Sequence, residues 1–189
     1  MTKLRVTAFL LLALLLPTIS SAQTTKPAKT PPKTSDELRE ECKKFVQDFY
    51  DWYLPKATAD VSKQGSTTEA LALKKRPDDF SRALKSALLT DAAASTKSTE
   101  VVGLDGDPFL NCQDCPKKVK FGDPKLTGYK CQVALHFMQD NVPEENPHVI
   151  AEAMYTQKRW VFTNFLDAEG GDDLLTTLKK LKADGSKPQ

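Results

Sequence analysis

The sequence predicts an α+β domain in which N-terminal helices pack on a curved four-stranded antiparallel sheet and a short C-terminal helix follows. Apolar side chains recur every three or four residues from Leu38 to Tyr53, which is the spacing of an amphipathic helix. From Tyr129 to Met138 apolar and polar side chains alternate, which is typical of a strand with one buried face. A length of 189 residues with 40% hydrophobic side chains suffices for one domain with a core.

Residues 1–22 have the pattern of a secretory signal peptide. Lys3 and Arg5 precede an apolar run from Val6 to Leu16, and small residues end at Ala22, where we expect cleavage. The run is shorter than the roughly 20 residues of a membrane span, so no stable span is expected after cleavage. The mature chain is therefore predicted to be periplasmic or secreted. Residues 23–34, rich in Thr, Lys and Pro, are predicted to form a flexible linker.

Three helical segments are expected before the sheet. The first begins at Ser35, a capping residue followed by two acids, and ends at Pro55. A brief helical turn is predicted over residues 69–75. A second long helix is predicted to begin at Pro77, since proline favours the first helical position. The apolar face of this helix comprises Phe80, Leu84, Ala87 and Leu88.

The segment from Gly103 to Pro116 predicts a long ordered connection between the helices and the sheet. Glycines, prolines, acids and two cysteines surround an apolar Phe109-Leu110 pair, which is the composition of turns rather than of a helix or strand interior.

The remainder predicts four strands and a closing helix. Gly122 and Pro124 interrupt the first strand, between Val119 and Leu126, and Gly128 forms the turn into the second. A polar acidic loop over residues 140–147 separates the second strand from the third. The third and fourth strands are expected over residues 148–157 and 159–166. A short helix beginning at residues 172–173 completes the domain, which spans residues 35–182, and residues 183–189 are expected to be a disordered tail.

The four cysteines predict two disulfides, because an even set in an exported chain favours pairing. If the hairpin turns at residues 127–128, Cys131 lies too far from Cys115, and Cys42 pairs with Cys131 while Cys112 pairs with Cys115. If residues 122–124 form the turn, Cys131 faces Cys115 and Cys42 is left with Cys112. The Gly128 turn favours the first pairing. Cys112 and Cys115 form a single CxxC without the following helix of thioredoxin-like enzymes and without the second pair of a zinc site, so no metal is expected.

Several short motifs resemble a bacterial family of exported proteins described as a domain of unknown function. They are the FYDWYL end of the first helix, DPFLNCQD, the glycine before the alternating strand, and Trp160 to Leu166 followed by an LLxxL helix. The resemblance covers roughly residues 36–182, and Cys112 and Cys115 depart from the family's motif. It implies a nuclear-transport-factor-2-like, cystatin-like α+β cone, a periplasmic or lipoprotein location, and no established activity. Other families with that fold include isomerases, dehydratases and binding proteins, so the fold does not assign a function.

The function predicted from these patterns is a non-catalytic binding module for an envelope protein or a small apolar ligand. The aromatic residues Phe49, Tyr50, Tyr53 and Trp160 are predicted to line a ligand pocket. A formal net charge of +2 gives no electrostatic basis for nucleic-acid binding. No catalytic residue or cofactor is assigned, since the common catalytic and phosphate-binding motifs are absent. The alternatives are a pocket enzyme of the lyase or isomerase type using Asp48 or Asp51, and a CxxC thiol-disulfide oxidoreductase.

Overall fold

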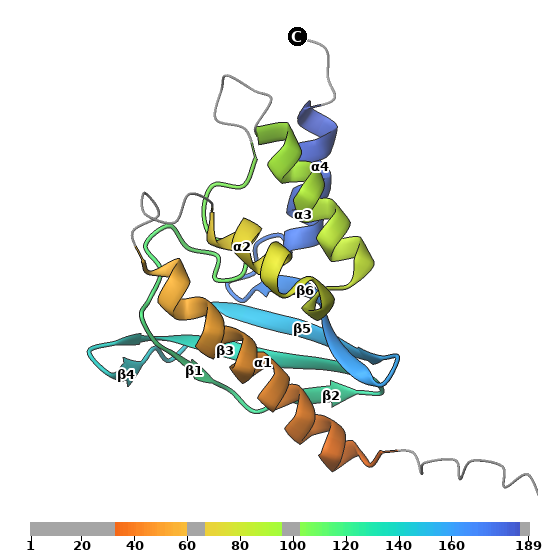
Figure 1. The fold of residues 1–189 in the computed structure, drawn as a ribbon. Coiled ribbons are helices and arrows are strands. Elements are labelled where there is room, and N and C mark those ends of the chain that lie inside the picture. The colour runs from red at the N-terminus through yellow and green to blue at the C-terminus, as the bar shows by residue number, and fades with distance from the viewer. Residues whose placement is uncertain (1–32, 60–66, 96–102, 186–189) are drawn as a thin grey trace, which may run out of the picture. The chain divides into compact units, whose positions relative to one another are not determined.

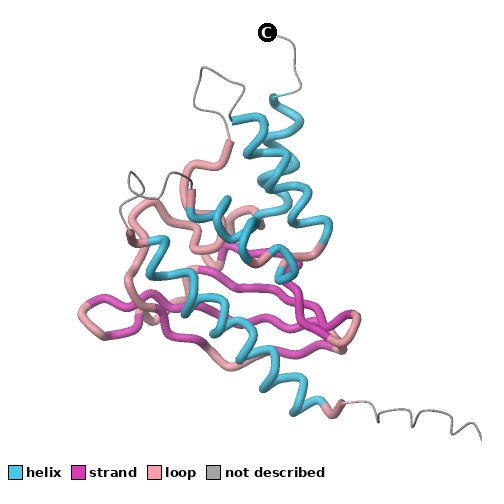
Figure 2. Tube along the Cα trace, viewed as in Figure 1, coloured by secondary structure: helices cyan, strands magenta, loops and turns pink. Residues whose placement is uncertain are grey.

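The computed structural model describes residues 33–59, 67–95 and 103–185 (Figure 1). The predicted signal peptide, most of the predicted linker and the last four residues of the predicted tail lie outside this range. The described chain is α+β, with four α-helices and six strands in one antiparallel sheet (Figure 2). The helices are α1 (Ser35–Ala57), α2 (Thr68–Lys75), α3 (Arg82–Ser95) and α4 (Leu174–Gly185). The strands are β1 (Val119–Phe121), β2 (Lys125–Thr127), β3 (Lys130–Gln139), β4 (Val142–Pro143), β5 (Val149–Thr156) and β6 (Arg159–Asp167).

Helix α1 begins at Ser35 as predicted, but its capping residue and its end differ from the prediction. Thr34, rather than Ser35, is the N-cap, and it forms a capping box in which Glu37 bonds back to the Thr34 backbone. At the other end the helix continues through Pro55 to Ala57. Proline removes only its own N–H bond, and the Thr58 N–H still donates to the Leu54 carbonyl at 3.1 Å, so the last turn closes beyond it.

The predicted second helix is divided in two. Residues 77–79 form a short 3₁₀ helix, Phe80 is extended, and α3 starts only at Arg82. The extended backbone lets Phe80 form a parallel bridge with Phe162 of β6 and bury its ring. Ser81 then caps α3 by accepting a hydrogen bond from the Leu84 N–H. The short helix predicted over residues 69–75 is α2.

The sheet contains six strands rather than the predicted four. Its path is β1-β3-β5-β6, and β2 and β4 also pair with β3. The first predicted strand is split into β1 and β2, because Pro124 has no N–H to contribute to the ladder. The predicted acidic loop contains β4, since positive φ angles at Asp140 (51°) and Asn141 (65°) turn the chain back onto β3.

Helix α1 lies across one face of the sheet, and α3 and α4 pack together at the β6 side (Figure 1). The side chains of β3 that face α1 are fully or almost fully buried, as the alternating pattern predicts. Helix α4 extends to Gly185, beyond the predicted end at residue 182. No helix among the described residues has both the length and the apolar character needed to cross a membrane.

One disulfide joins α1 to the sheet, and the other closes a short loop within the Gly103–Pro116 segment. Cys42 of α1 pairs with Cys131 of β3 across 6.6 Å between Cα atoms, and Cys112 pairs with Cys115 across 5.4 Å. Cys131 lies opposite Leu126 in the β2–β3 hairpin that turns at Gly128. The pairing is therefore the one that the Gly128 turn favours.

Candidate functional site

The aromatic residues predicted to line a pocket are part of the packed core. Phe49, Tyr50 and Tyr53 of α1 are 0% exposed, and Trp160 at the start of β6 is 6% exposed. The Phe49 ring stacks on Tyr53 at 5.2 Å and meets Phe162 at 4.8 Å, so other rings fill the space around it. None of the four lines either of the two cavities described below. The structure therefore places these side chains in the packed core, and a ligand pocket at them stays a prediction.

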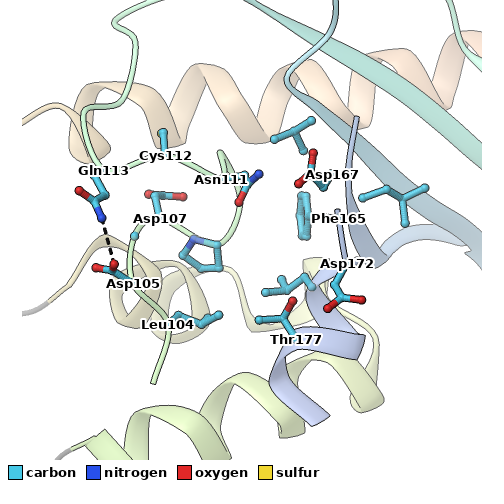
Figure 3. Close-up of a pocket in the computed structure, with 15 residues that line it drawn as sticks. Leu104, Asp105, Asp107, Asn111, Cys112, Gln113, Phe165, Asp167, Asp172 and Thr177 are labelled. Carbon is cyan, nitrogen blue, oxygen red and sulfur yellow. Dashed lines mark hydrogen bonds between the residues drawn. The ribbon is translucent and has the colours of Figure 1, made fainter. Parts of the chain in front are cut away.

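The candidate site is a cavity of about 280 Å³ between the Gly103–Pro116 segment, the paired ends of β5 and β6, and the start of α4. Figure 3 shows Asp107 and Asn111 of the segment on one side, and Phe165, Asp167 and Asp172 on the other. A more open hollow lies along α3. The lining of the cavity comprises Leu104, Asp105, Gly106, Asp107, Pro108, Asn111, Cys112, Gln113, Val149, Phe165, Leu166, Asp167, Asp172, Leu174 and Thr177.

Asp107 holds the segment that forms one wall of this cavity. One carboxylate oxygen accepts hydrogen bonds from the backbone N–H groups of Phe109 (2.9 Å) and Leu110 (3.1 Å). The other accepts from the Tyr53 hydroxyl at 2.6 Å. Burial raises the pKa of Asp107, and these three donors oppose the rise because they favour the ionised form. The carboxylate thus joins the segment to α1.

The backbone of the segment adds further constraints on the cavity wall. The Asp107 N–H donates to the Cys112 carbonyl at 2.8 Å, and the Asn111 N–H donates to the Asp107 carbonyl at 2.7 Å. Gly106 has φ +136°, and a Cβ there would lie 2.9 Å from the Cys112 oxygen, so only glycine fits. Phe109 and Leu110 are fully buried beneath these bonds. The wall is therefore held in place without a ligand.

Tyr53→Phe is expected to lower the free energy of unfolding by about 2 kcal/mol, because the buried Asp107 carboxylate loses a donor. Tyr50→Phe is the matched control, since the Tyr50 hydroxyl donates to the neutral Phe109 carbonyl at 2.6 Å. It should cost only about 1 kcal/mol. Urea unfolding at pH 7 measures both values. If both variants lost the same free energy of unfolding, the hydrogen bond from Tyr53 to the Asp107 carboxylate would be no stronger than the bond from Tyr50 to the Phe109 carbonyl.

The lining of the cavity combines apolar side chains with carboxylates. Val149, Phe165 and Leu174 are buried and supply apolar walls. Four aspartates contribute to the lining, whereas no lysine, arginine or histidine does so among the described residues. These aspartates are Asp105, Asp107, Asp167 and Asp172.

A second buried acid lies behind the Asp107 wall. Burial raises the pKa of Glu69 on α2 to about 7, and the negative charges of Asp91 and Asp107 add to the rise. Its Oε1 atom is buried without a hydrogen-bond partner in the described structure. Glu69 therefore favours its protonated form in the folded state.

Glu69→Gln is expected to flatten the dependence of stability on pH. Because the pKa is higher in the folded state, the proton-linked stability is present below pH 4.5 and is lost as the pH rises to about 7. The variant has no group that titrates here and should not lose this stability. At pH 8 its free energy of unfolding should therefore exceed that of the wild type by up to about 3 kcal/mol. Chemical unfolding between pH 4 and pH 8 measures the difference, with Glu40→Gln on the exposed side of α1 as the control. A constant difference across this range would contradict the assignment.

The two acids considered for catalysis lie on α1 and do not line the candidate cavity. Asp48 forms an ion pair with Lys44 at 3.0 Å, and Asp51 is exposed on the solvent side of α1. Irregular chain and then β1, rather than a helix, follow Cys115, so the thioredoxin-like context is missing here too. Within the described ranges, no group of three or more His, Cys, Asp or Glu side chains is arranged to hold a metal ion.

The two histidines bind backbone carbonyls. The Nδ1 atom of His136 lies 2.9 Å from the Glu144 oxygen, and the Nε2 atom of His148 lies 3.3 Å from the Asn111 oxygen. The His148 ring also stacks on Phe137 at 4.1 Å. Both rings thus stabilise local structure.

Comparisons of the chain with known protein families, with curated proteins and with solved structures found no match. The candidate site therefore depends on the geometry alone. The sequence patterns do not assign a ligand-binding role to Asp107, Asn111, Phe165 or Asp167. The available signal was the apolar Phe109-Leu110 pair directly after Asp107-Pro108, because a polar segment that buries two large side chains needs an acceptor for its backbone N–H groups.

Proposed function

We propose that the chain is an exported, non-catalytic binding module that holds a small, partly apolar ligand in the cavity between the Gly103–Pro116 segment, β6 and α4. The observation that carries the proposal is that the cavity is already formed, with one wall fixed by Asp107 and the other by strand and helix ends. Small-molecule sites are usually preformed, concave and largely apolar with a few polar groups.

Export is supported by the signal-peptide pattern and by the two disulfides, which persist in oxidising compartments. The long helix across an antiparallel sheet supports a cone of the nuclear-transport-factor-2-like kind and the resemblance to the exported family. A ligand site is favoured over a protein-docking site because the polar groups converge on a concavity rather than on a flat surface.

The proposal is tested by titrating small apolar and amphiphilic compounds into the mature protein while recording amide NMR spectra. Shifts should be confined to the amides of residues 104–113, the end of β6 and the start of α4. Thr177→Phe, which places a ring in the cavity, should abolish them. Lys179→Phe, exposed on the same helix and outside the lining, should leave them unchanged. Shifts elsewhere, or none at any residue, would contradict the proposed site.

A further inference from the structure

We infer that the ligand of this cavity carries a positive charge beside an apolar body, as an organic ammonium or guanidinium compound does. The inference rests on the proposed function and adds the ligand's chemical class. It follows from the carboxylates and apolar side chains that line the cavity together, and in particular from which carboxylate oxygens accept no hydrogen bond from the described residues.

The four aspartates of the lining are not equivalent. Asp107 accepts three hydrogen bonds through its two oxygens and is committed to the fold. Asp172 forms an ion pair with Lys180 of α4. Asp105 accepts one bond from the Gln113 amide at 3.0 Å, and Asp167 accepts one from the Glu169 N–H at 2.8 Å. Among the described residues, the second oxygen of both Asp105 and Asp167 accepts no hydrogen bond, so these two are available to a ligand.

The two available carboxylates belong to different walls of the cavity. Asp105 lies in the Gly103–Pro116 segment, whereas Asp167 ends β6, and Figure 3 shows them on opposite sides of the hollow. A ligand between them meets negative charge from both walls. Asp91 of α3 adds a further carboxylate beside the first wall, because it accepts a hydrogen bond from the N–H of Leu104, a lining residue, at 3.2 Å.

The apolar walls determine the rest of the ligand. Leu104, Val149, Phe165 and Leu174 place apolar surface beside these carboxylates, where a charge is screened less than in open solvent. A bare metal ion would gain nothing from these walls, and a neutral hydrocarbon would leave the carboxylates without a counter-charge. An anion would be repelled by carboxylates on both walls. A cation with an apolar body can contact the apolar walls and also neutralise the carboxylates.

The test uses three compounds of nearly equal size and shape: benzylammonium, benzyl alcohol and benzoate. Each is titrated into the mature oxidised protein at pH 7.5 in 20 mM salt, and dissociation constants are taken from the amide shifts of the cavity residues. Benzylammonium should bind at least 10-fold more tightly than benzyl alcohol, and benzoate should not bind. Raising the salt to 0.5 M should weaken benzylammonium binding and leave benzyl alcohol binding unchanged.

Two substitutions test whether Asp105 and Asp167 cause the preference for benzylammonium. Asp105→Asn and Asp167→Asn should each reduce the preference for benzylammonium over benzyl alcohol by about 3-fold or more. Asp114→Asn, an exposed acid of the same segment outside the lining, should not change it.

The possible failures are distinguishable. Equal binding of benzylammonium and benzyl alcohol in the cavity would overturn the inferred charge but leave the proposed function standing. The inferred charge would also be overturned if the preference for benzylammonium over benzyl alcohol were unchanged in both Asp105→Asn and Asp167→Asn. Absence of binding by all three compounds and by the wider compound set would overturn both the inference and the proposed function.

Discussion

Replacing Cys42 and Cys131 together with alanine is expected to lower the free energy of unfolding by about 4 kcal/mol. The bond closes a loop of sequence separation 89 and joins α1 to β3, the strand with which β1, β2, β4 and β5 all pair. Its loss releases a long stretch of the unfolded chain from constraint, which stabilises the unfolded state. Both side chains are 0% exposed, so alanine is the substitution that leaves no buried polar group.

Urea unfolding of oxidised wild type, of Cys42→Ala/Cys131→Ala and of Cys112→Ala/Cys115→Ala measures this effect. The second pair closes a loop of sequence separation 3, so its removal should cost only about 2 kcal/mol by the same loop-closure argument. Equal losses from the two double variants, or a loss below 1 kcal/mol for the Cys42 pair, would show that loop closure does not set the contribution of these bonds.

Phe109→Ala is expected to cost about 4 kcal/mol and to disorganise the cavity at the same time. The ring is 0% exposed and lies 5.0 to 5.7 Å from the rings of Phe49, Tyr53, Phe80 and Phe165. Truncation leaves a hole at the point where α1, β6 and the Gly103–Pro116 segment meet. Because Phe109 is two residues from Asp107 and from Asn111, both of which line the cavity, ligand binding should fall together with stability.

Two control substitutions test whether the loss of stability comes from the buried volume at Phe109, rather than from the removal of any aromatic ring. Phe109→Leu retains most of the apolar volume and should cost less than about 1.5 kcal/mol. Tyr129→Ala removes a ring that is 61% exposed and should change stability by no more than about 0.5 kcal/mol. A small loss for Phe109→Ala would mean that the segment is held by its hydrogen bonds rather than by its buried ring.

The elements that could be predicted from the sequence are those whose signal is local and periodic. The apolar stripe of α1 and the alternation in β3 describe which face each element buries, and the structure buries those faces. The termini of these elements depend on single hydrogen bonds. Thr34 rather than Ser35 therefore caps α1, and Pro55 does not end it. The extended conformation of Phe80 depends on its pairing with Phe162, a residue 82 positions away that no local pattern indicates.

The cavity could not be predicted for a related reason. Aromatic residues on α1 satisfy the usual composition of a ligand pocket, but the same composition describes a packed core. Which of the two forms depends on whether Phe109, Phe162 and Phe165 reach that helix, and they come from other parts of the chain. The acids of the cavity resemble ordinary loop acids in the sequence, because Asp105 and Asp167 come together only when β6 ends beside the Gly103–Pro116 segment.

The arrangement at the two margins of the sheet has a consequence for self-association. On one margin β1 and β2 are three residues each, separated at Gly122–Pro124 and carrying Lys120 and Lys125, so no long row of free backbone groups faces outward. On the other margin Phe80 and Ser81 bind β6 through Phe162, and α3 and α4 pack beside it. Extension of the sheet by a second copy along β6, as in amyloid-type growth, therefore requires the Phe80 segment to leave Phe162. Conditions that detach α3 should cause aggregation before they unfold α1.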